Sequence, residues 1–264
     1  MKIYGHRGCR GILPENSIEG FKKAIEIGAD GIEWDVVVNK NNELIISHEP
    51  YIDSSYCLFK GDKIKNKNKS ALNIYKMDTD QIAQYDCGSL YQSKFPSQQL
   101  IKTTKPTVKK ALELLKNKNP TILFEIKSSE EDYEKFQPRP KEYCQIIKKE
   151  LEEYPNLENI IFMSFDANII NELEKIMPDQ RYVYLVYKPK INIKAYLRKI
   201  NFSPYALGMY HKLIKKTTIA KLHNKKIKVF AWTVNDKKKG LALRNKQLDG
   251  LITDYPNIFV DQLK

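Results

Sequence analysis

The chain has few of the residues and patterns that mark several large protein classes. It contains four cysteines in 264 residues, and none form a Cys-x-x-Cys pair, so no zinc site is expected. We interpret all four as free thiols: Cys9, Cys57, Cys87 and Cys144. No apolar run approaches the roughly 18 residues that a membrane-spanning helix needs, so no integral membrane contact is expected. The early glycines lack the spacing of a dinucleotide-binding loop.

The chain also lacks a recognisable secretory signal, because Met1 and Lys2 lead directly into an apparent strand. The sequence therefore predicts a cytoplasmic protein, or a periplasmic or secreted one if a signal peptide has been removed. The net charge of +13 comes from scattered lysines, a distribution typical of solvated faces. We expect no nucleic-acid partner, although the positive field would attract an anionic substrate. No particular oligomeric state is indicated.

Short apolar runs alternate with stretches of helical periodicity, which predicts a parallel sheet covered by helices. The expected strands are Lys2–Gly5, Gly31–Val38, Glu43–Ser47, Thr121–Lys127, Asn159–Ser164, Arg181–Tyr187, Tyr205–Tyr210, Ile227–Val234 and Gly250–Thr253. Only four residues separate the second and third runs, too few for a parallel crossover. These two runs should form a hairpin with the second outside the barrel, which leaves the eight strands of a (β/α)8 TIM barrel.

The expected helices are Ser17–Ile27, Val108–Lys116, Lys141–Glu153, Asn168–Ile176, Ile193–Ile200, Ile214–Asn224 and Asp236–Lys246. Asn16 and Glu19 have the spacing of a capping box for the first helix, and Gly28 suits its end. The segment 51–105 breaks the alternation of strands and helices, and it is too long to be an ordinary loop. We expect a small insertion subdomain at the barrel mouth, the alternative being a partly disordered excursion. The whole chain, 1–264, is then one catalytic domain.

Seven polar residues fall at or near the ends of the first strands, where barrel enzymes carry their active sites. They are His6 and Arg7 after the first strand, Glu33 and Asp35 on the second, His48 after the hairpin strand, and Glu125 and Lys127 on the run Thr121–Lys127. Each carboxylate pair or carboxylate–lysine pair is spaced i, i+2, so its two members face the same way. Two of the four histidines belong to this constellation.

Carboxylates on apolar strands must be paired or must coordinate a metal. The oxygen donors Glu33, Asp35 and Glu125 suit one divalent cation, Mg²⁺ or Ca²⁺, and the alternative is an ion-pair network with Arg7 and Lys127. Two histidines beside such a cluster indicate an acid and a base. Elsewhere, Trp232 either lines the pocket or belongs to the core, His223 is expected on the surface, and His211 has no assigned role.

Motifs along the whole chain resemble the glycerophosphodiester phosphodiesterase family. They are Gly5-His6-Arg7-Gly8, Pro14-Glu15-Asn16-Ser17, residues 28–36 (GADGIEWDV), Ser47-His48-Glu49-Pro50, Phe124-Glu125-Ile126-Lys127, Ser164-Phe165-Asp166, residues 231–235 (AWTVN) and residues 249–256 (DGLITDYP). No single motif is specific, but the ordered set is. The family pattern commonly has His-Asp where this chain has His48-Glu49.

The resemblance implies a TIM barrel with an insertion after the second strand, and hydrolysis of glycerophosphodiesters to sn-glycerol 3-phosphate and an alcohol in glycerophospholipid breakdown. It implies Glu33, Asp35 and Glu125 as metal ligands and His6 and His48 as acid–base residues. Arg7 and Lys127 would contact the phosphate of this small-molecule substrate, and we add Trp232 as a further substrate-binding candidate. The sequence does not indicate which histidine is the acid and which is the base. It also leaves two nucleophiles open, water and the glycerol 2-hydroxyl.

Two alternatives remain open. A lysophospholipase D or a phosphoinositide phospholipase C on a similar barrel would need an apolar face for acyl chains. The insertion offers apolar candidates for such a face: Leu58, Phe59, Leu90, Tyr91 and Phe95. The alternative from another class is a non-catalytic basic protein that binds nucleic acid or anionic lipid in a salt-sensitive way.

Overall fold

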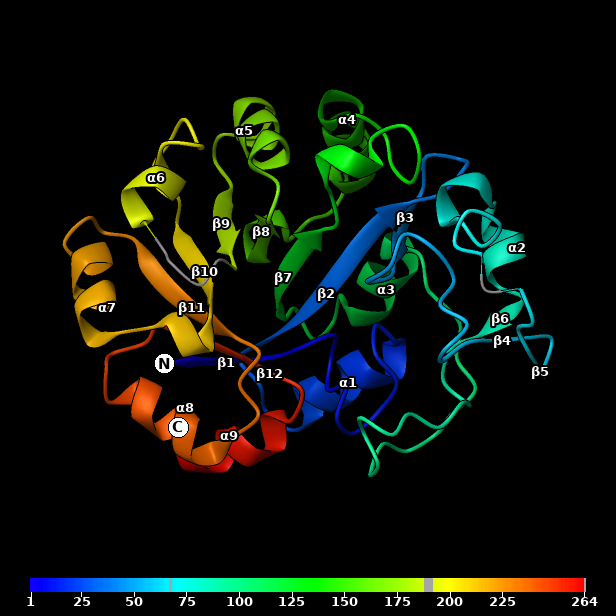
Figure 1. The fold of residues 1–264 in the computed structure, drawn as a ribbon, viewed down its shortest axis with the longest axis horizontal. Coiled ribbons are helices and arrows are strands. Elements are labelled where there is room, and N and C mark those ends of the chain that lie inside the picture. The colour runs from blue at the N-terminus through cyan, green and yellow to red at the C-terminus, as the bar shows by residue number, and fades with distance from the viewer. Residues whose placement is uncertain (67, 188–191, 264) are drawn as a thin grey trace.

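The computed structural model describes residues 1–66, 68–187 and 192–263, and it contains a closed barrel of eight parallel strands. The barrel strands are β1 (Lys2–Gly5), β2 (Gly31–Val38), β7 (Thr121–Ile126), β8 (Ile160–Ser164), β9 (Arg181–Val186), β10 (Ala206–Tyr210), β11 (Lys228–Trp232) and β12 (Gly250–Thr253). Each strand pairs with the next, and β1 pairs with both β12 and β2, which closes the barrel (Figure 1). The predicted TIM barrel is confirmed.

The predicted hairpin between the second and third strand candidates, which leaves eight strands for the barrel, is also confirmed. Strand β3 (Leu44–Ile46) runs antiparallel to β2, with Val36 opposite Ile46 and Val38 opposite Leu44. It pairs with no other barrel strand, so it lies outside the closed ring. The chain therefore runs back along β2 from Val38 to the level of Asp35, where the Ser47 amide donates to the Asp35 carbonyl at 2.9 Å, and this places His48 at the barrel mouth.

Helices surround the barrel, and short 3-10 turns join them to the strands (Figure 1). The helices are α1 (Ile18–Glu26), α3 (Val108–Leu115), α4 (Pro140–Leu151), α5 (Ala167–Ile176), α6 (Ile193–Leu197), α7 (Lys216–His223), α8 (Lys237–Arg244) and α9 (Pro256–Leu263). The 3-10 turns outside the insertion are Glu130–Asp132, Leu157–Asn159 and His211–Leu213. Observed helix ends differ from the predicted ones by a few residues.

The start of α1 corrects one prediction. Ser17, and not Asn16, caps the helix, because the Ser17 hydroxyl accepts a hydrogen bond from the Gly20 amide at 3.0 Å. The Asn16 side chain turns away and donates to Asp35 Oδ2 at 2.9 Å. The helix ends as predicted, with Gly28 at φ +89°, a backbone conformation that favours glycine.

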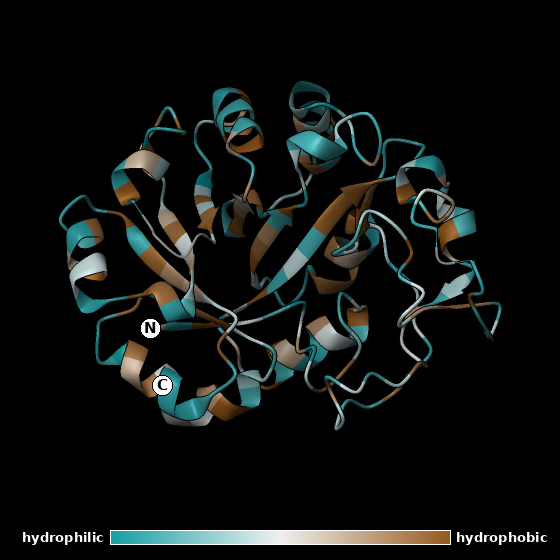
Figure 2. Cartoon of the chain, viewed as in Figure 1, coloured by the Kyte–Doolittle hydropathy of each residue, from teal (hydrophilic) through white to brown (hydrophobic). Residues whose placement is uncertain are grey.

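The strands alternate between two apolar layers, as their two-residue period requires. Ile32, Trp34 and Val36 face the larger core between barrel and helices. The intervening positions face the barrel interior, where a smaller apolar cluster includes Leu123. Glu33 pairs in register with Leu123, and Asp35 with Glu125, so these carboxylates point into the barrel above an apolar floor. In Figure 2 the barrel strands are mostly hydrophobic, whereas the helices carry both classes of residue.

The segment between β3 and α3 folds onto the hairpin side of the barrel mouth. Its elements are β4 (Leu58–Phe59), β5 (Asp62–Lys63), a 3-10 turn (Ile74–Lys76), α2 (Thr79–Ile82) and β6 (Tyr85–Asp86). It has its own apolar core, in which Ile52, Ile74 and Ile82 pack against Val37 and Ile45 of the hairpin. The described part of the insertion is therefore folded rather than a disordered excursion.

The prediction of four free thiols is wrong for two of them. Cys57 and Cys87 form a disulfide with an S–S distance of 2.08 Å, while Cys9 and Cys144 are free and buried. The two bonded cysteines are 30 residues apart, and the antiparallel pairing of Leu58 with Asp86 brings them together. Such pairing between two-residue strands leaves no pattern in the sequence.

We expect the double variant Cys57→Ser, Cys87→Ser to unfold at lower urea concentration, because the bond restricts a 30-residue loop of the unfolded insertion. The expected loss in free energy of unfolding is about 2–4 kcal/mol. A reductant should lower the midpoint of the wild type and leave that of the double variant unchanged. Equal midpoints for the two proteins without reductant would contradict the prediction.

A partly buried carboxylate joins helix α4 to the hairpin. Glu150 Oε2 accepts a hydrogen bond from the Leu44 amide at 2.9 Å. Burial raises the pKa of Glu150 from 4.5 to about 7. The folded protein therefore binds more protons than the unfolded chain between these values, so this residue's stabilising contribution is present below pH 4.5 and is lost as the pH rises through 7.

We expect Glu150→Gln to be more stable than the wild type at pH 8, because glutamine can keep the bond to Leu44 without a buried charge. The expected gain is roughly 1–2 kcal/mol after allowing for solvent near the carboxyl, and it should shrink toward zero at pH 4.5. Thermal unfolding at several pH values measures the difference. The exposed Glu153→Gln, two residues beyond the end of α4, is the control and should show no such trend.

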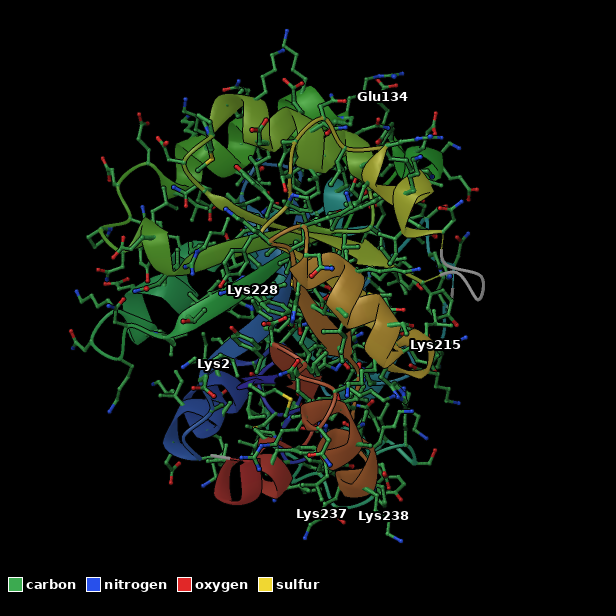
Figure 3. The ribbon with its side chains drawn as sticks, turned by 90° about the vertical axis from the view of Figure 1, so that its left-hand side faces the viewer. Lys2, Glu134, Lys215, Lys228, Lys237 and Lys238 are labelled. Carbon is green, nitrogen blue, oxygen red and sulfur yellow. A yellow bond between two sulfur atoms is a disulfide. The ribbon has the colours of Figure 1, made fainter. Side chains whose placement is uncertain are left out.

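Charged side chains are spread over the outside of the molecule. Figure 3 shows Lys2, Lys215 and Lys228 at separate places on the face in view, with Lys237 and the adjacent Lys238 at its lower edge. Within the described ranges, no helix combines the length and apolar character needed to cross a membrane.

Candidate active site

The barrel mouth brings together polar residues that lie on β2 and β7 or follow β1, β3 and β7. A cavity of about 180 Å³ opens there. Seven of the predicted site residues line it: His6, Arg7, Glu33, His48, Glu125, Lys127 and Trp232. The eighth, Asp35, is fully buried beneath the cavity. The structure thus gathers residues from opposite ends of the chain, since His6 and Trp232 line one cavity.

Three carboxylates form a buried acidic cluster. Glu33, Asp35 and Glu125 each offer an oxygen, all within 4.8 Å of one another, and the three residues are 1%, 0% and 8% exposed. Burial raises the pKa of Glu33 well above its usual value, and the charges of Asp35 and Glu125 add to the shift. Burial also acts to raise the pKa of Asp35, but Lys127 and Arg7 outweigh it and hold that pKa well below the usual range.

The ion pairs of Arg7 and Lys127 with these carboxylates, expected as the alternative to a metal site, are present. They do not provide a hydrogen bond to every carboxylate oxygen of the acidic cluster. Lys127 Nζ lies 2.6 Å from Glu125 Oε1 and 3.4 Å from Asp35 Oδ1, and Arg7 Nε lies 3.2 Å from Asp35 Oδ2. Among the residues that the structure describes, Glu33 Oε1 and Asp35 Oδ1 are nevertheless buried without a hydrogen-bond partner. Buried oxygens that lack donors, in a cluster of three carboxylates, fit a divalent cation.

His6 is held by a carboxylate at the opposite end of the chain. Its Nδ1 donates to Asp254 Oδ1 at 2.6 Å, while its Nε2 lies 4.0 Å from Glu33 Oε2. Asp254 also accepts from Arg10 Nε at 2.9 Å and from the Asn235 side chain at 2.6 Å. Burial lowers the pKa of His6 from 6.5 to about 4 against the opposing effect of Asp254, so the imidazole is neutral at neutral pH.

His48 has a similar arrangement on the other side of the cavity. Its Nδ1 donates to Glu49 Oε1 at 2.6 Å, and the side chain is 32% exposed. The extra methylene of Glu49, relative to the aspartate common in the family pattern, therefore still allows the carboxylate to reach the imidazole. In both histidines Nδ1 is engaged, which leaves Nε2 as the nitrogen that can exchange a proton with a bound molecule.

Arg7 is held through both its backbone and its side chain. Its amide donates to Glu33 Oε2 at 2.7 Å, its Nη1 donates to Glu15 Oε1 at 2.7 Å, and its backbone has a positive φ of 49°. A left-handed conformation at a non-glycine residue stores strain, which the surrounding contacts must offset. Arg10, Lys94 and Lys127 also line the cavity, so it presents several cations to an anionic group.

Aromatic rings form the wall opposite the hairpin. Trp232 lines the cavity and packs against Phe165 at 5.3 Å and against Tyr187 and Tyr210 at 5.7 Å each, between ring centroids. Phe165 and Tyr187 are 40% and 62% exposed. Trp232 is therefore a cavity residue in contact with exposed aromatic rings, rather than a core residue alone.

The remaining histidines lie outside the cavity lining. His211 stacks edge-on against Tyr210, and the partly exposed His223 is hydrogen-bonded to Asp249 at 2.8 Å. Sequence reasoning gave no role to Asp254, Arg10 or Phe165. Asp254 and Phe165 belong to motifs that carry the family resemblance, which was the available signal. Arg10 belongs to none of them, and its pairing with Asp254 depends on the contact between the two ends of the chain.

Comparisons with known proteins agree with this architecture. The family model described as "Glycerophosphoryl diester phosphodiesterase family" matches residues 6–258. A glycerophosphodiester phosphodiesterase of Caldanaerobacter subterraneus subsp. tengcongensis is 25% identical over 262 residues, which cover 99% of this chain and 97% of that protein.

Solved structures show the same fold. A candidate glycerophosphoryl diester phosphodiesterase from Silicibacter pomeroyi aligns with a TM-score of 0.88 at 22% identity, covering 99% of this chain and 93% of that one. An Oleispira antarctica phosphodiesterase, in complex with the product sn-glycerol-3-phosphate, aligns with a TM-score of 0.78 at 22% identity, covering 97% and 94%.

Proposed function

The chain belongs to the glycerophosphoryl diester phosphodiesterase family, and we propose that it hydrolyses glycerophosphodiesters to sn-glycerol 3-phosphate and an alcohol, in glycerophospholipid breakdown. The observation that supports this most strongly is the buried acidic cluster, flanked by two histidines whose Nδ1 atoms are each held by a carboxylate. A phosphoric diester hydrolase needs such parts: charge to match the phosphodiester and groups that move protons. The whole chain, 1–264, acts as one catalytic domain.

We assign the metal site to Glu33, Asp35 and Glu125, and Mg²⁺ or Ca²⁺ to it, because the donors are all oxygens. A bound divalent cation supplies positive charge that polarises the phosphoryl oxygens and offsets charge in the transition state. Lys127 stays beside Glu125 and contributes a second positive charge toward the cavity. Arg7, fixed by Glu15 and Asp35, presents its guanidinium to the phosphate oxygens.

Proton transfer falls to His6 and His48. Each presents Nε2, so one takes a proton from the nucleophile and the other gives a proton to the leaving alcohol oxygen. Asp254 and Glu49 keep the rings in the tautomer and orientation that this requires. If the glycerol 2-hydroxyl is the nucleophile, a cyclic phosphate accumulates early in the reaction and ³¹P NMR detects it, whereas direct attack by water gives none. Trp232 packs against the glycerol or the alcohol at the cavity wall.

Substrate class is tested by comparing turnover of glycerophosphocholine, lysophosphatidylcholine and a phosphoinositide. The insertion residues suggested for an acyl-binding face do not line the cavity, and Phe95 is buried. We therefore expect glycerophosphocholine to be the best of the three. The exposed aromatic wall is the feature that favours a lysophospholipid instead, and faster turnover of lysophosphatidylcholine would support that alternative.

The compartment follows from a different feature. Of the two compartments expected from the sequence, the disulfide favours the periplasmic or secreted one, because such bonds persist mainly in oxidising compartments. We propose that the protein works in an oxidising compartment, the periplasm or the exterior. Alkylation of thiols in freshly lysed cells tests this, and labelling of Cys57 and Cys87 in the native protein would return the assignment to the cytoplasm.

A further inference from the structure

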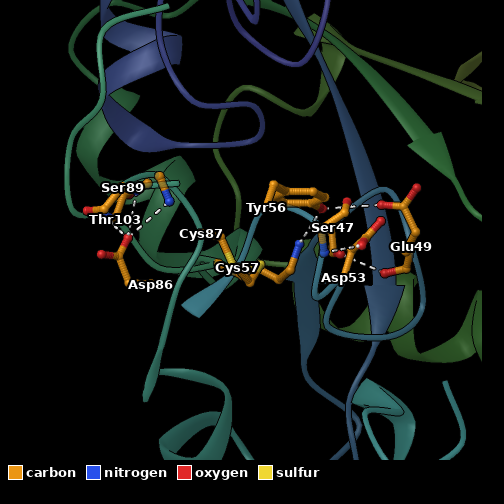
Figure 4. Close-up of a disulfide and its surroundings, with 12 residues drawn as sticks. Ser47, Glu49, Asp53, Tyr56, Cys57, Asp86, Cys87, Ser89 and Thr103 are labelled. Atoms are coloured by element: carbon orange, nitrogen blue, oxygen red, sulfur yellow. Dashed lines mark hydrogen bonds between the residues drawn. A yellow bond between two sulfur atoms is a disulfide. The ribbon is translucent and has the colours of Figure 1, made fainter. Parts of the chain in front are cut away.

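A buried tyrosine lies between the disulfide and the site. Tyr56 is 6% exposed and precedes Cys57, whose bond to Cys87 ties it to the far strand of the insertion. Figure 4 shows Tyr56 between that disulfide and Glu49. Backbone amides of residues 56 and 57 both bond to the Asp53 carbonyl, so the chain around Tyr56 is fixed locally as well.

The tyrosine hydroxyl connects a buried lysine to the carboxylate that holds His48. Tyr56 donates to Glu49 Oε2 at 3.2 Å, and Lys105 Nζ donates to the Tyr56 hydroxyl at 3.2 Å. The other Glu49 oxygen accepts from His48 Nδ1 at 2.6 Å. Both carboxylate oxygens are therefore used, one toward the insertion and one toward the cavity.

Lys105 is an unusual residue to bury, at 8% exposed. Its ammonium also lies 5.2 Å from the centre of the Tyr56 ring, which adds a cation–π contact. Burial lowers the pKa of Lys105, against the opposing charges of Glu49, Glu15 and Asp53. A long charged side chain is buried only at a cost, and polar contacts of this kind reduce that cost.

The network connects the two ends of the insertion. Glu49 lies two residues before the insertion, Tyr56 beside its disulfide, and Lys105 at its end, before α3. The Glu49 backbone is held as well, because the buried Ser47 hydroxyl donates to the Glu49 carbonyl at 2.6 Å. The Glu49 carbonyl and both of its carboxylate oxygens are thus hydrogen-bonded, which restrains the carboxylate in the position where it holds the partly exposed His48 ring.

We propose that Tyr56 and Lys105 are positioning residues for His48 and act through Glu49. The insertion then contributes to the reaction rate as well as to the cavity wall. The proposal rests on the proposed function, in which His48 exchanges a proton through Nε2. Loss of the tyrosine hydroxyl frees one Glu49 oxygen, lets the carboxylate rotate, and allows the imidazole to leave its productive orientation, while the phosphate-binding residues stay in place.

The test is steady-state kinetics of Tyr56→Phe on glycerophosphocholine with saturating divalent metal. We expect kcat to fall about 10-fold, as small misplacements of catalytic groups do, with KM within about twofold of the wild type. Lys105→Met should likewise lower kcat and leave KM nearly unchanged. Because both act through one carboxylate, the double variant should lose little more than either single variant. Tyr85→Phe, whose ring lies in the same subdomain against Phe59, is the matched control.

The possible failures are distinguishable. His48→Ala is measured in parallel, and full activity there would remove the proposed role of His48 and this proposal with it. A severe loss in His48→Ala, with Tyr56→Phe and Lys105→Met matching Tyr85→Phe, would overturn only the positioning role. The positioning role would also be overturned if either single variant raised KM without changing kcat. The same holds if the fold-loss of kcat in the double variant equalled the product of the two single losses. Thermal unfolding confirms that each variant compared is folded.

Discussion

Replacing either cavity histidine with alanine is expected to lower kcat by about 10²–10⁴ without unfolding the protein. Each ring engages a carboxylate through Nδ1, His6 with Asp254 and His48 with Glu49, so each presents Nε2 as its proton-exchanging atom. Alanine removes that atom and leaves the acidic cluster intact. Rates of glycerol 3-phosphate release under saturating substrate measure the loss.

His223→Ala is the control for this experiment, because His223 is also paired with an aspartate but lies away from the cavity. It should retain wild-type turnover. Near wild-type turnover in His6→Ala or His48→Ala would remove that residue from the proposed chemistry.

Replacing Glu33 with glutamine is expected to change activity and metal-free stability in opposite directions. Three carboxylates whose oxygens lie within 4.8 Å repel one another, so removing one charge should raise the melting temperature measured in EDTA. The same change removes a proposed metal ligand. Turnover should fall by about 10²–10⁴, which corresponds to several kcal/mol of lost charge stabilisation.

Metal binding supplies the second readout. Added Mg²⁺ or Ca²⁺ should raise the melting temperature of the wild type by mass action and have little effect on Glu33→Gln. Glu131→Gln, an exposed carboxylate, should respond to metal as the wild type does. A wild-type melting temperature that neither cation shifts, or a Glu33→Gln variant that both still stabilise, would contradict the assigned metal site.

The barrel and its inward carboxylates were predictable because local rules determine them. The two-residue period of a strand places Glu33 and Asp35 on one face, and the short turn before β3 excludes a parallel crossover. Strand ends in a barrel converge on one mouth, so the polar residues there were expected to meet. Their convergence on one cavity required no knowledge of side-chain contacts.

What could not be predicted depends on contacts between distant residues. Asn16 has the spacing of a helix cap, but Asp35 offers its side chain a buried partner instead. Asp254 reaches His6 only because β1 and β12 close the barrel. The Cys57–Cys87 bond depends on which two-residue strands pair, and Tyr56 looks like any insertion tyrosine until Glu49 and Lys105 are seen beside it.

The measurement that tests the central claim most directly is release of sn-glycerol 3-phosphate from glycerophosphocholine and glycerophosphoethanolamine. It should be run with EDTA and then with Mg²⁺ or Ca²⁺ restored. The account predicts turnover that EDTA abolishes and one of these cations recovers. A folded protein that releases no glycerol 3-phosphate with either metal would contradict it, and salt-sensitive binding without turnover would point to a non-catalytic basic binding protein.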